Sequence, residues 1–182
     1  MINRHSILAR GIHWFTALAI LTLVILGFWM TQRAAANLWD NLTNMLYGWH
    51  KLIGFSVLLI TLFRIFLKLS SKTPEYPQNI SPRLIRIASK VHYILYGLLF
   101  IVPMLGWAGV TAYPALITIG GYSLPAMPGI PKSELIARQI FQIHGLLAMA
   151  LIAVALLHIA AALNHLIIKL IRKQIHLLGT VR

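Results

Sequence analysis

Residues 140–168, IFQIHGLLAMALIAVALLHIAAALNHLII, decide the fold, because this stretch is long and apolar enough to cross a membrane and still carries histidines. His144 and His158 are separated by two heptads. An α-helix rises 1.5 Å per residue, so these side chains lie about 21 Å apart along the axis, and in a left-handed bundle they return to the same face. One helix therefore presents a candidate metal ligand near each membrane surface.

The composition places the whole chain in a membrane. Its 182 residues are 59% hydrophobic, the mean hydropathy is +0.79, and only three residues are acidic, Asp40, Glu75 and Glu134. A spanning helix needs about 20 mostly apolar residues, and its backbone groups must pair internally in lipid. The stretches that meet this requirement are 11–30, 47–68, 91–110 and 140–168. The sequence predicts an all-α, integral membrane four-helix bundle that forms a single transmembrane domain over residues 1–182.

The basic residues predict the orientation, because positively charged loops stay on the cytoplasmic side. Both termini and the middle loop carry most of them: Arg4, Arg10, Arg64, Lys68, Lys72, Arg83, Arg86, Lys90, Lys169, Arg172, Lys173 and Arg182. The opposite side has Arg33, Lys51, Lys132 and Arg138. We therefore expect both termini in the cytoplasm and a multi-pass protein of the bacterial inner membrane. The net charge of +13 is explained by contact with anionic membrane lipids, which makes nucleic-acid binding the poorer interpretation.

The connections differ in character. Residues 31–46 are interpreted as a short polar link, and residues 69–90, which contain Pro74, Pro77 and Pro82, as a non-helical loop. Residues 111–139 are nearly uncharged and rich in proline and glycine, and we expect them to form a lid on the periplasmic surface. A cleaved leader is the alternative for residues 11–30, but this apolar run is longer than a leader needs, so we expect the helix to be retained.

The histidines fall at matching depths. His50 and His144 begin the second and fourth helices near the periplasmic surface, where they can face each other. His13 and His158 lie near the opposite surface and form a second pair. His92 and His165 make a third, cytoplasmic group, whereas His5 and His176 lie in charged flanks and are interpreted as solvated. An ionisable side chain inside a membrane helix is a functional candidate by default, although a single interfacial histidine is more often a hydrogen-bonding residue than a ligand.

Two imidazoles at each level suit the axial positions of a planar macrocycle. Zinc or copper is the alternative, but the chain has no cysteine and no well-placed carboxylate to complete a four-ligand set. The pattern therefore predicts two bis-histidine b-type haems. Small residues that can make room for them, or that serve ordinary helix packing, are Gly27, Gly48, Gly54, Gly97, Gly106, Gly145, Ala148, Ala155, Ala161 and Ala162.

The sequence resembles the bacterial di-haem cytochrome b561 family, whose founding relatives act as membrane superoxide:ubiquinone oxidoreductases. The resemblance covers nearly the whole chain. It is carried by Ile12-His13-Trp14, Gly48-Trp49-His50-Lys51, Arg64 with Lys68, His92 followed by Tyr96 and Pro103, and His144, His158 and His165. It implies that His50 with His144 and His13 with His158 hold the two haems, which is the pairing that depth predicts.

The resemblance also implies roles for the remaining polar residues. His92 and His165 would belong to a ubiquinone pocket, with an interfacial position or a haem-propionate contact as the alternative. Arg64 would balance a haem propionate, because a buried positive charge needs an anionic partner. Electrons would pass from superoxide on the periplasmic side to ubiquinone.

Four bases are candidates for attracting an anionic donor on the periplasmic side. Lys51, Arg138 and Lys132, with Arg33 beside them, would form a positive funnel that raises the association rate. Contact with lipid headgroups is the alternative.

Three other functional classes are alternatives for a chain with this sequence. A proton-coupled transporter is disfavoured, because no acidic residue lies well within a span. A haem-bearing anchor that passes electrons between quinone and a partner dehydrogenase or hydrogenase remains the serious rival, and residues 111–139 would provide its docking surface. A purely structural membrane protein would explain the helices but not the depth-matched histidines.

Overall fold

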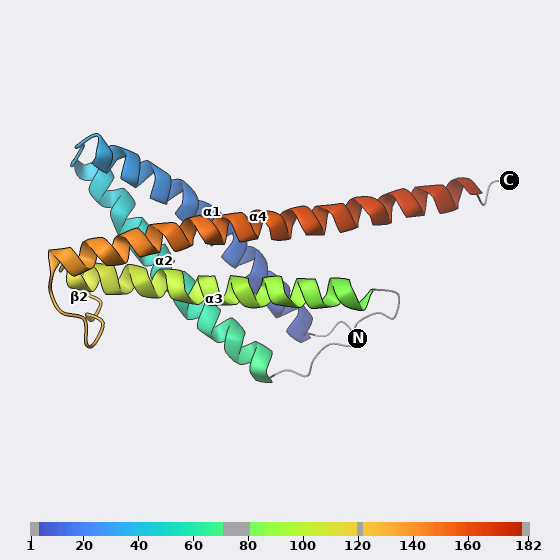
Figure 1. Ribbon diagram of the computed structural model, residues 1–182, viewed down its shortest axis with the longest axis horizontal. Helices are drawn as coiled ribbons and strands as arrows, with labels where there is room; N and C mark the ends of the chain where they lie inside the picture. The colour runs from blue at the N-terminus through green and yellow to red at the C-terminus, as the bar shows by residue number, and fades with distance from the viewer. Residues whose placement is uncertain (1–3, 71–80, 120–121, 180–182) are drawn as a thin grey trace.

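A computed structural model of the chain describes residues 4–70, 81–119 and 122–179, and it consists of four long helices that form two hairpins (Figure 1). The helices are α1 (Arg4–Ala35), α2 (Asn41–Ser70), α3 (Pro82–Ala112) and α4 (Glu134–Gly179), and a small antiparallel pair, β1 (Thr118–Ile119) and β2 (Tyr122–Ser123), lies between the last two. The first hairpin is α1 with α2, and the second hairpin is α3 with α4. Helix α2 packs on α3 and joins the hairpins.

The predicted fold class, an all-α four-helix membrane bundle, is confirmed. Each of the four helices contains a window long and apolar enough to cross a bilayer. Large apolar side chains point away from the bundle, among them Trp14 with 71% of its surface exposed and Leu146 with the same fraction. An exposed apolar surface of this extent is the surface that lipid chains cover.

The helix ends lie at two opposite ends of the bundle, called the terminal end and the loop end. The terminal end has the start of α1 and α3 and the ends of α2 and α4, and the loop end has the α1–α2 turn and residues 113–133 (Figure 1). The C-terminal part of α4 extends well past the other helices at the terminal end (Figure 1). Both termini therefore belong to the same side of the bundle, and the assignment of that side to the cytoplasm stays a prediction.

All four helices are longer than their apolar stretches, and one predicted loop is wrong in part. Residues 82–90 were expected to be non-helical, but α3 begins at Pro82, which occupies the first turn. Proline is favoured there, because its missing N–H would have no intrahelical partner in any case. Hydropathy marks only the part of a helix that lies in lipid, so it cannot reveal polar extensions. Pro74, Pro77 and the rest of residues 71–80 lie outside the described part of the chain.

Local hydrogen bonds, and not the burial of apolar side chains, hold the α1–α2 turn in its conformation. Asn37 adopts the left-handed conformation with a φ of 56°, and the backbone N–H of Leu38 bonds the carbonyl of Arg33. This is the Schellman termination of a helix. Asp40 then caps α2, since its carboxylate accepts the Thr43 N–H at 3.0 Å and pairs with Arg33 at 2.5 Å.

A seven-residue repeat organises the interior into three levels. Each helix contributes one residue to each level: His13, Ile20 and Gly27 on α1; His50, Val57 and Arg64 on α2; His92, Leu99 and Gly106 on α3; His144, Leu151 and His158 on α4. The middle level is the apolar core, in which Val57, Leu99 and Leu151 are buried and Ile20 packs against them. Neighbouring levels are about 10 Å apart, because seven residues of helix rise by that distance.

The contact between Gly109 of α3 and Phe141 of α4 predicts a sensitive position. A Cβ at Gly109 would lie 2.5 Å from Cε1 of Phe141, and two further atoms of that ring would lie within 3.0 Å of it. We expect Gly109→Ala to lower the free energy of unfolding by about 1–3 kcal/mol, the usual cost of overpacking. The measurement is detergent-solubilised thermal or denaturant unfolding. Gly97→Ala on the same helix is the matched control, because nothing lies within 4 Å of its added Cβ, so its stability should be equal or slightly higher.

The cap at Asp40 predicts a pH dependence at the loop end. The hydrogen bond from the Thr43 backbone N–H, followed by that from Arg33, lowers the pKa of Asp40 from its ordinary value of 3.8 to about 2. The unfolded chain therefore takes up this proton first on acidification, and the stabilisation present above pH 3.8 is lost as the pH falls to about 2. Asp40→Asn should abolish this part of the acid dependence in pH-resolved unfolding. An unchanged acid limb would contradict the assignment.

Candidate functional site

At the loop end, the structure brings His50 of α2 and His144 of α4 face to face. Their ring centres are 6.3 Å apart and their planes make an angle of 76°. The two residues belong to different hairpins, so the pair forms only when the hairpins dock. Both residues are partly buried.

His144 is held by the backbone of α3. Its Nδ1 lies 2.9 Å from the carbonyl oxygen of Val102. A carbonyl can only accept, so Nδ1 carries the proton and Nε2 is left free to bind a metal. Gly106, one turn later, makes this contact possible, because a Cβ there would lie 3.3 Å from Cε1 of His144.

His50 has a similar glycine neighbour on α1. A Cβ at Gly27 would lie 3.4 Å from Cε1 of His50, so α1 approaches this ring as closely as α3 approaches the other. The Nδ1 of His50 is buried and faces the Leu23 carbonyl without forming a hydrogen bond of good geometry. The loop-end level thus consists of two imidazoles and two glycines, one from each helix.

At the terminal end, His13 of α1 and His158 of α4 form a second pair with the same spacing. Their ring centres are 6.3 Å apart and the interplanar angle is 81°. His92 of α3 lies beside them, 5.2 Å from the ring of His158. The sequence grouped His92 with His165, but the structure brings His92 into contact with the pair itself. His165 lies on α4, and its side chain is outside the described part.

Two cations border the terminal-end level. Arg64 of α2 stacks on the ring of Tyr96, 5.4 Å from its centre, and the seven-residue repeat places it at the same level as His13 and His92. Lys68, one turn on, lies 4.2 Å from the ring centre of Tyr93 and 4.9 Å from that of Tyr96. These cation–π contacts join α2 to α3. This level therefore consists of three imidazoles and a guanidinium, whereas the loop-end level consists of two imidazoles and two glycines.

The spacing of both pairs fits two imidazoles on opposite sides of one metal ion. An imidazole nitrogen lies about 2 Å from the ion and about 1.2 Å from its own ring centre, so two such rings in line across the ion have centres about 6.4 Å apart. The observed 6.3 Å matches in both pairs, whereas the 5.2 Å between His92 and His158 is too short. In the described residues, no three histidine or acidic side chains converge into a larger ligand set. The arrangement suits an axially ligated haem better than tetrahedral zinc, and the ligand roles themselves stay predictions.

The bases expected to form a funnel at the loop end are not equivalent. Arg33 pairs with Asp40 and donates to Thr43, so its charge is offset. Lys51 is half-buried and donates to the carbonyls of Ala115 and Leu116. Arg138 is 78% exposed and lies 3.8 Å from Glu134, a weak surface pair, and Lys132 is exposed.

Residues 113–133 fold back on the end of α3. The indole N–H of Trp107 donates to the Pro125 carbonyl at 3.1 Å, and Met127 N–H donates to the Thr111 hydroxyl at 2.9 Å. Ile117 is buried with only 4% of its surface exposed. The segment is thus tied to the same helix that supports His144.

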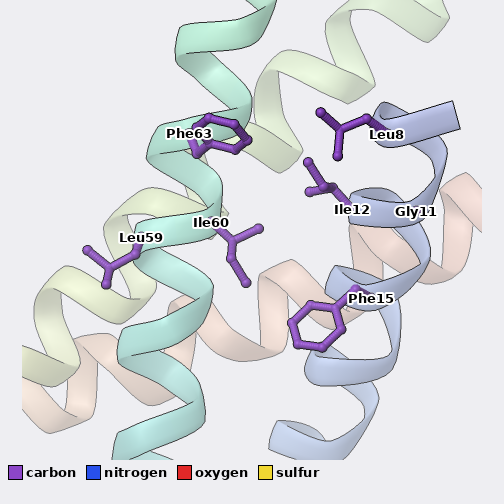
Figure 2. A pocket seen from close by; sticks show the side chains of 7 residues that line it. All are labelled: Leu8, Gly11, Ile12, Phe15, Leu59, Ile60 and Phe63. Atoms are coloured by element: carbon purple, nitrogen blue, oxygen red, sulfur yellow. The ribbon is translucent and has the colours of Figure 1, made fainter. Parts of the chain in front are cut away.

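An apolar groove of about 490 Å³ lies between α1 and α2 (Figure 2). Its lining residues are Leu8, Gly11, Ile12, Phe15, Leu59, Ile60 and Phe63. None of them carries a polar side chain. The groove therefore suits a hydrocarbon chain and takes no part in the chemistry of the histidine levels.

Several site residues escaped the sequence analysis. Gly27 and Gly106 were noted only among many small residues, and the Val102 carbonyl and the contact between Lys68 and Tyr93 were not foreseen. The available signal was the spacing of two heptads that separates Gly27 from His13 and Gly106 from His92.

Comparison with known proteins agrees with this site. The family model for prokaryotic cytochrome b561 matches residues 4–175. The chain is 26% identical over 165 residues to cytochrome b561 homolog 2 of Escherichia coli K12, covering 90% of this chain and 85% of that protein. It is 27% identical over 179 residues to the probable superoxide oxidase CybB of Yersinia pestis, covering 93% of each.

Proposed function

Because the chain belongs to the prokaryotic cytochrome b561 family, a family of membrane haem proteins, we propose that it holds two haem b groups and carries electrons between the two faces of the membrane. The observation that carries this proposal is the equal ring spacing of 6.3 Å in both histidine pairs. Haem supplies one-electron transfer when it is bound. The chain's own residues hold and orient it.

The loop-end residues support this role by fixing ring orientation. The Val102 carbonyl keeps Nε2 of His144 free to act as a ligand, and the matching imidazole comes from His50. Gly27 and Gly106 leave room on either side of the pair. At the terminal end, His13 and His158 are the ligands in this proposal.

Arg64 is assigned to a haem propionate. Its guanidinium lies at the terminal-end level and stacks on the ring of Tyr96, and it forms no salt bridge within the described part of the chain. Arginine binds carboxylates through charge-assisted hydrogen bonds. This assignment accounts for a cation inside a spanning helix.

For the reactants, we propose superoxide at the loop end and ubiquinone at the terminal end. The relative named a probable superoxide oxidase supports the first, and the position of His92 beside the terminal pair supports the second. Two superoxide ions would each lose one electron to leave two molecules of dioxygen, and one quinone would take up two electrons and two protons to become a quinol. His92, with His165 on the same side of the bundle, would hydrogen-bond a quinone carbonyl and pass protons.

The orientation in this proposal follows the basic residues. The loop end faces the periplasm of the bacterial inner membrane, where exposed Lys132 and Arg138 attract an anion. A small diffusible donor needs no docked protein. A haem-bearing anchor for a dehydrogenase or hydrogenase remains the alternative outcome of the tests below.

The haem assignment predicts a stoichiometry. Purified protein should contain two b haems per chain, and His144→Ala and His13→Ala should each retain one, because each variant breaks a different pair. A pyridine haemochrome assay with a reduced-minus-oxidised spectrum measures this. His176→Ala, in the charged C-terminal flank, is the control and should retain both haems. A haem-free preparation from cells with ample haem would contradict the proposal.

The reactant assignment predicts activity without a partner. The purified chain should reduce ubiquinone while superoxide is generated, and the rate should fall as salt is added, because salt screens the attraction to exposed bases. Arg138→Gln combined with Lys132→Gln should slow the reaction severalfold and flatten its salt dependence.

The control for this assay is addition of superoxide dismutase, which should abolish the ubiquinone reduction. Activity that appears only after a second protein is added would favour the anchor function. If a preparation that retains both haems does not reduce ubiquinone with superoxide, the proposed reaction is excluded but the haem assignment stands.

A further inference from the structure

The spacing of the loop-end pair depends on how the two hairpins dock. His50 lies on the first hairpin and His144 on the second, and His144 is bonded to α3. The ring spacing is therefore a distance between separate units. Apolar packing, such as that of Phe55 on Trp107 with ring centres 5.4 Å apart, brings α2 and α3 together but is not directional.

Lys51 makes a directional link at this level. It follows His50 immediately on α2, and its Nζ lies 3.1 Å from the Ala115 carbonyl oxygen and 3.4 Å from that of Leu116. These acceptors are 64 and 65 residues away along the chain and belong to the segment after α3.

The acceptors of Lys51 are themselves fixed to the second hairpin. The backbone N–H of Ala115 donates to the carbonyl of Val110 at 2.9 Å, in the last turn of α3. Ile117, two residues later, is buried. The ammonium of Lys51 thus bonds to a segment that is itself hydrogen-bonded to α3 and partly buried in the second hairpin.

We propose that Lys51 is a positioning residue that locks the first hairpin onto residues 113–117 and thereby sets the spacing of His50 and His144. This inference rests on the proposed haem function, because the spacing matters only for a group bound between the rings. It replaces the steering role that the sequence indicated for Lys51.

The chemistry of the link explains why a lysine stands here. Hydrogen bonds from an ammonium to carbonyl oxygens are charge-assisted and directional, and a half-buried site weakens the competition from water. Two of the three N–H donors are used by the loop carbonyls. Their dipoles also offset the field that a diffusing anion would feel.

A second lysine offers a reciprocal comparison. Lys68 links the same two hairpins at the terminal end, where it lies against Tyr93 and Tyr96 of α3. A change at Lys51 should affect the loop-end pair, and a change at Lys68 should affect the terminal-end pair. This contrast separates positioning from a general loss of stability.

The experiment uses the full, haem-loaded chain with Lys51→Met, which keeps the apolar stem but removes the donor. Electron paramagnetic resonance of the ferric protein gives one low-spin signal for each haem, and the loop-end signal is identified as the one lost in His144→Ala. We expect Lys51→Met to shift or broaden that signal alone. Amide hydrogen exchange in residues 113–117 should rise at least tenfold.

Three controls define the interpretation. Lys51→Arg should restore both readouts, because the guanidinium can still donate to the carbonyls. Lys132→Met removes the same charge from the same end and should alter neither readout. Lys68→Met should change the other low-spin signal and leave exchange in residues 113–117 as it was.

The positioning role is overturned if Lys51→Met leaves the loop-end signal and the exchange rates unchanged, or if both signals change equally. Should Lys51→Met not fold, Lys51→Gln, which is too short to reach the carbonyls, gives the same test. A wild-type chain without haem would reject the proposed function instead, and exchange in residues 113–117 would still report whether Lys51 holds the segment.

Discussion

The separation of two imidazole rings carried by different hairpins is the constraint on which the site depends. A metal–ligand distance tolerates errors of only about 0.2 Å, whereas helix axes pack with a latitude of about 2 Å. The seven-residue repeat reduces this mismatch, because it places each histidine directly above or below the buried Val57, Leu99 and Leu151. Close packing of these aliphatic side chains holds the helices in place relative to one another. A shift of one helix would otherwise change the ring spacing in both histidine pairs. The apolar core therefore sets the positions of the histidines in the levels on both sides of it.

The two levels share one ring spacing but differ in what surrounds the rings. At the loop end, glycines bring α1 and α3 against the imidazoles, and a backbone carbonyl fixes the tautomer of His144. A carbonyl neither gives nor takes protons under ordinary conditions, so that level is suited to electron transfer alone. At the terminal end, His92 occupies the place on α3 that Gly106 has at the loop end, and Arg64 occupies the place on α2 that His50 has. The terminal end is therefore where the proposed reaction with a quinone would find an imidazole beside the proposed ligands.

The sequence predicted the bundle and the histidine pairs because both follow from properties that are local to each helix. Hydropathy identifies a span, and distance along the helix gives depth, so His50 matches His144 without any knowledge of packing. Helix limits were poorly predicted, since Pro82, Asp40 and Asn37 act through caps and turns that hydropathy does not register. The neighbours of each pair were missed for another reason. The bond from His144 to Val102 joins residues 42 positions apart, and only docking of the hairpins creates it.

Counting charges predicts an orientation in the membrane, but it does not distinguish the roles of individual bases. Arg33, Lys51, Lys132 and Arg138 look alike in a list of loop-end cations, yet the structure pairs the first with a carboxylate and the second with carbonyl oxygens. A cation whose field is already offset by nearby anions or dipoles attracts a diffusing anion less than one that faces water. Lys132 and Arg138 are the exposed bases at this end, so they are the ones proposed to attract an anion. Lys51, closest in sequence to a histidine of the pair, is better placed to hold that histidine than to recruit its reactant.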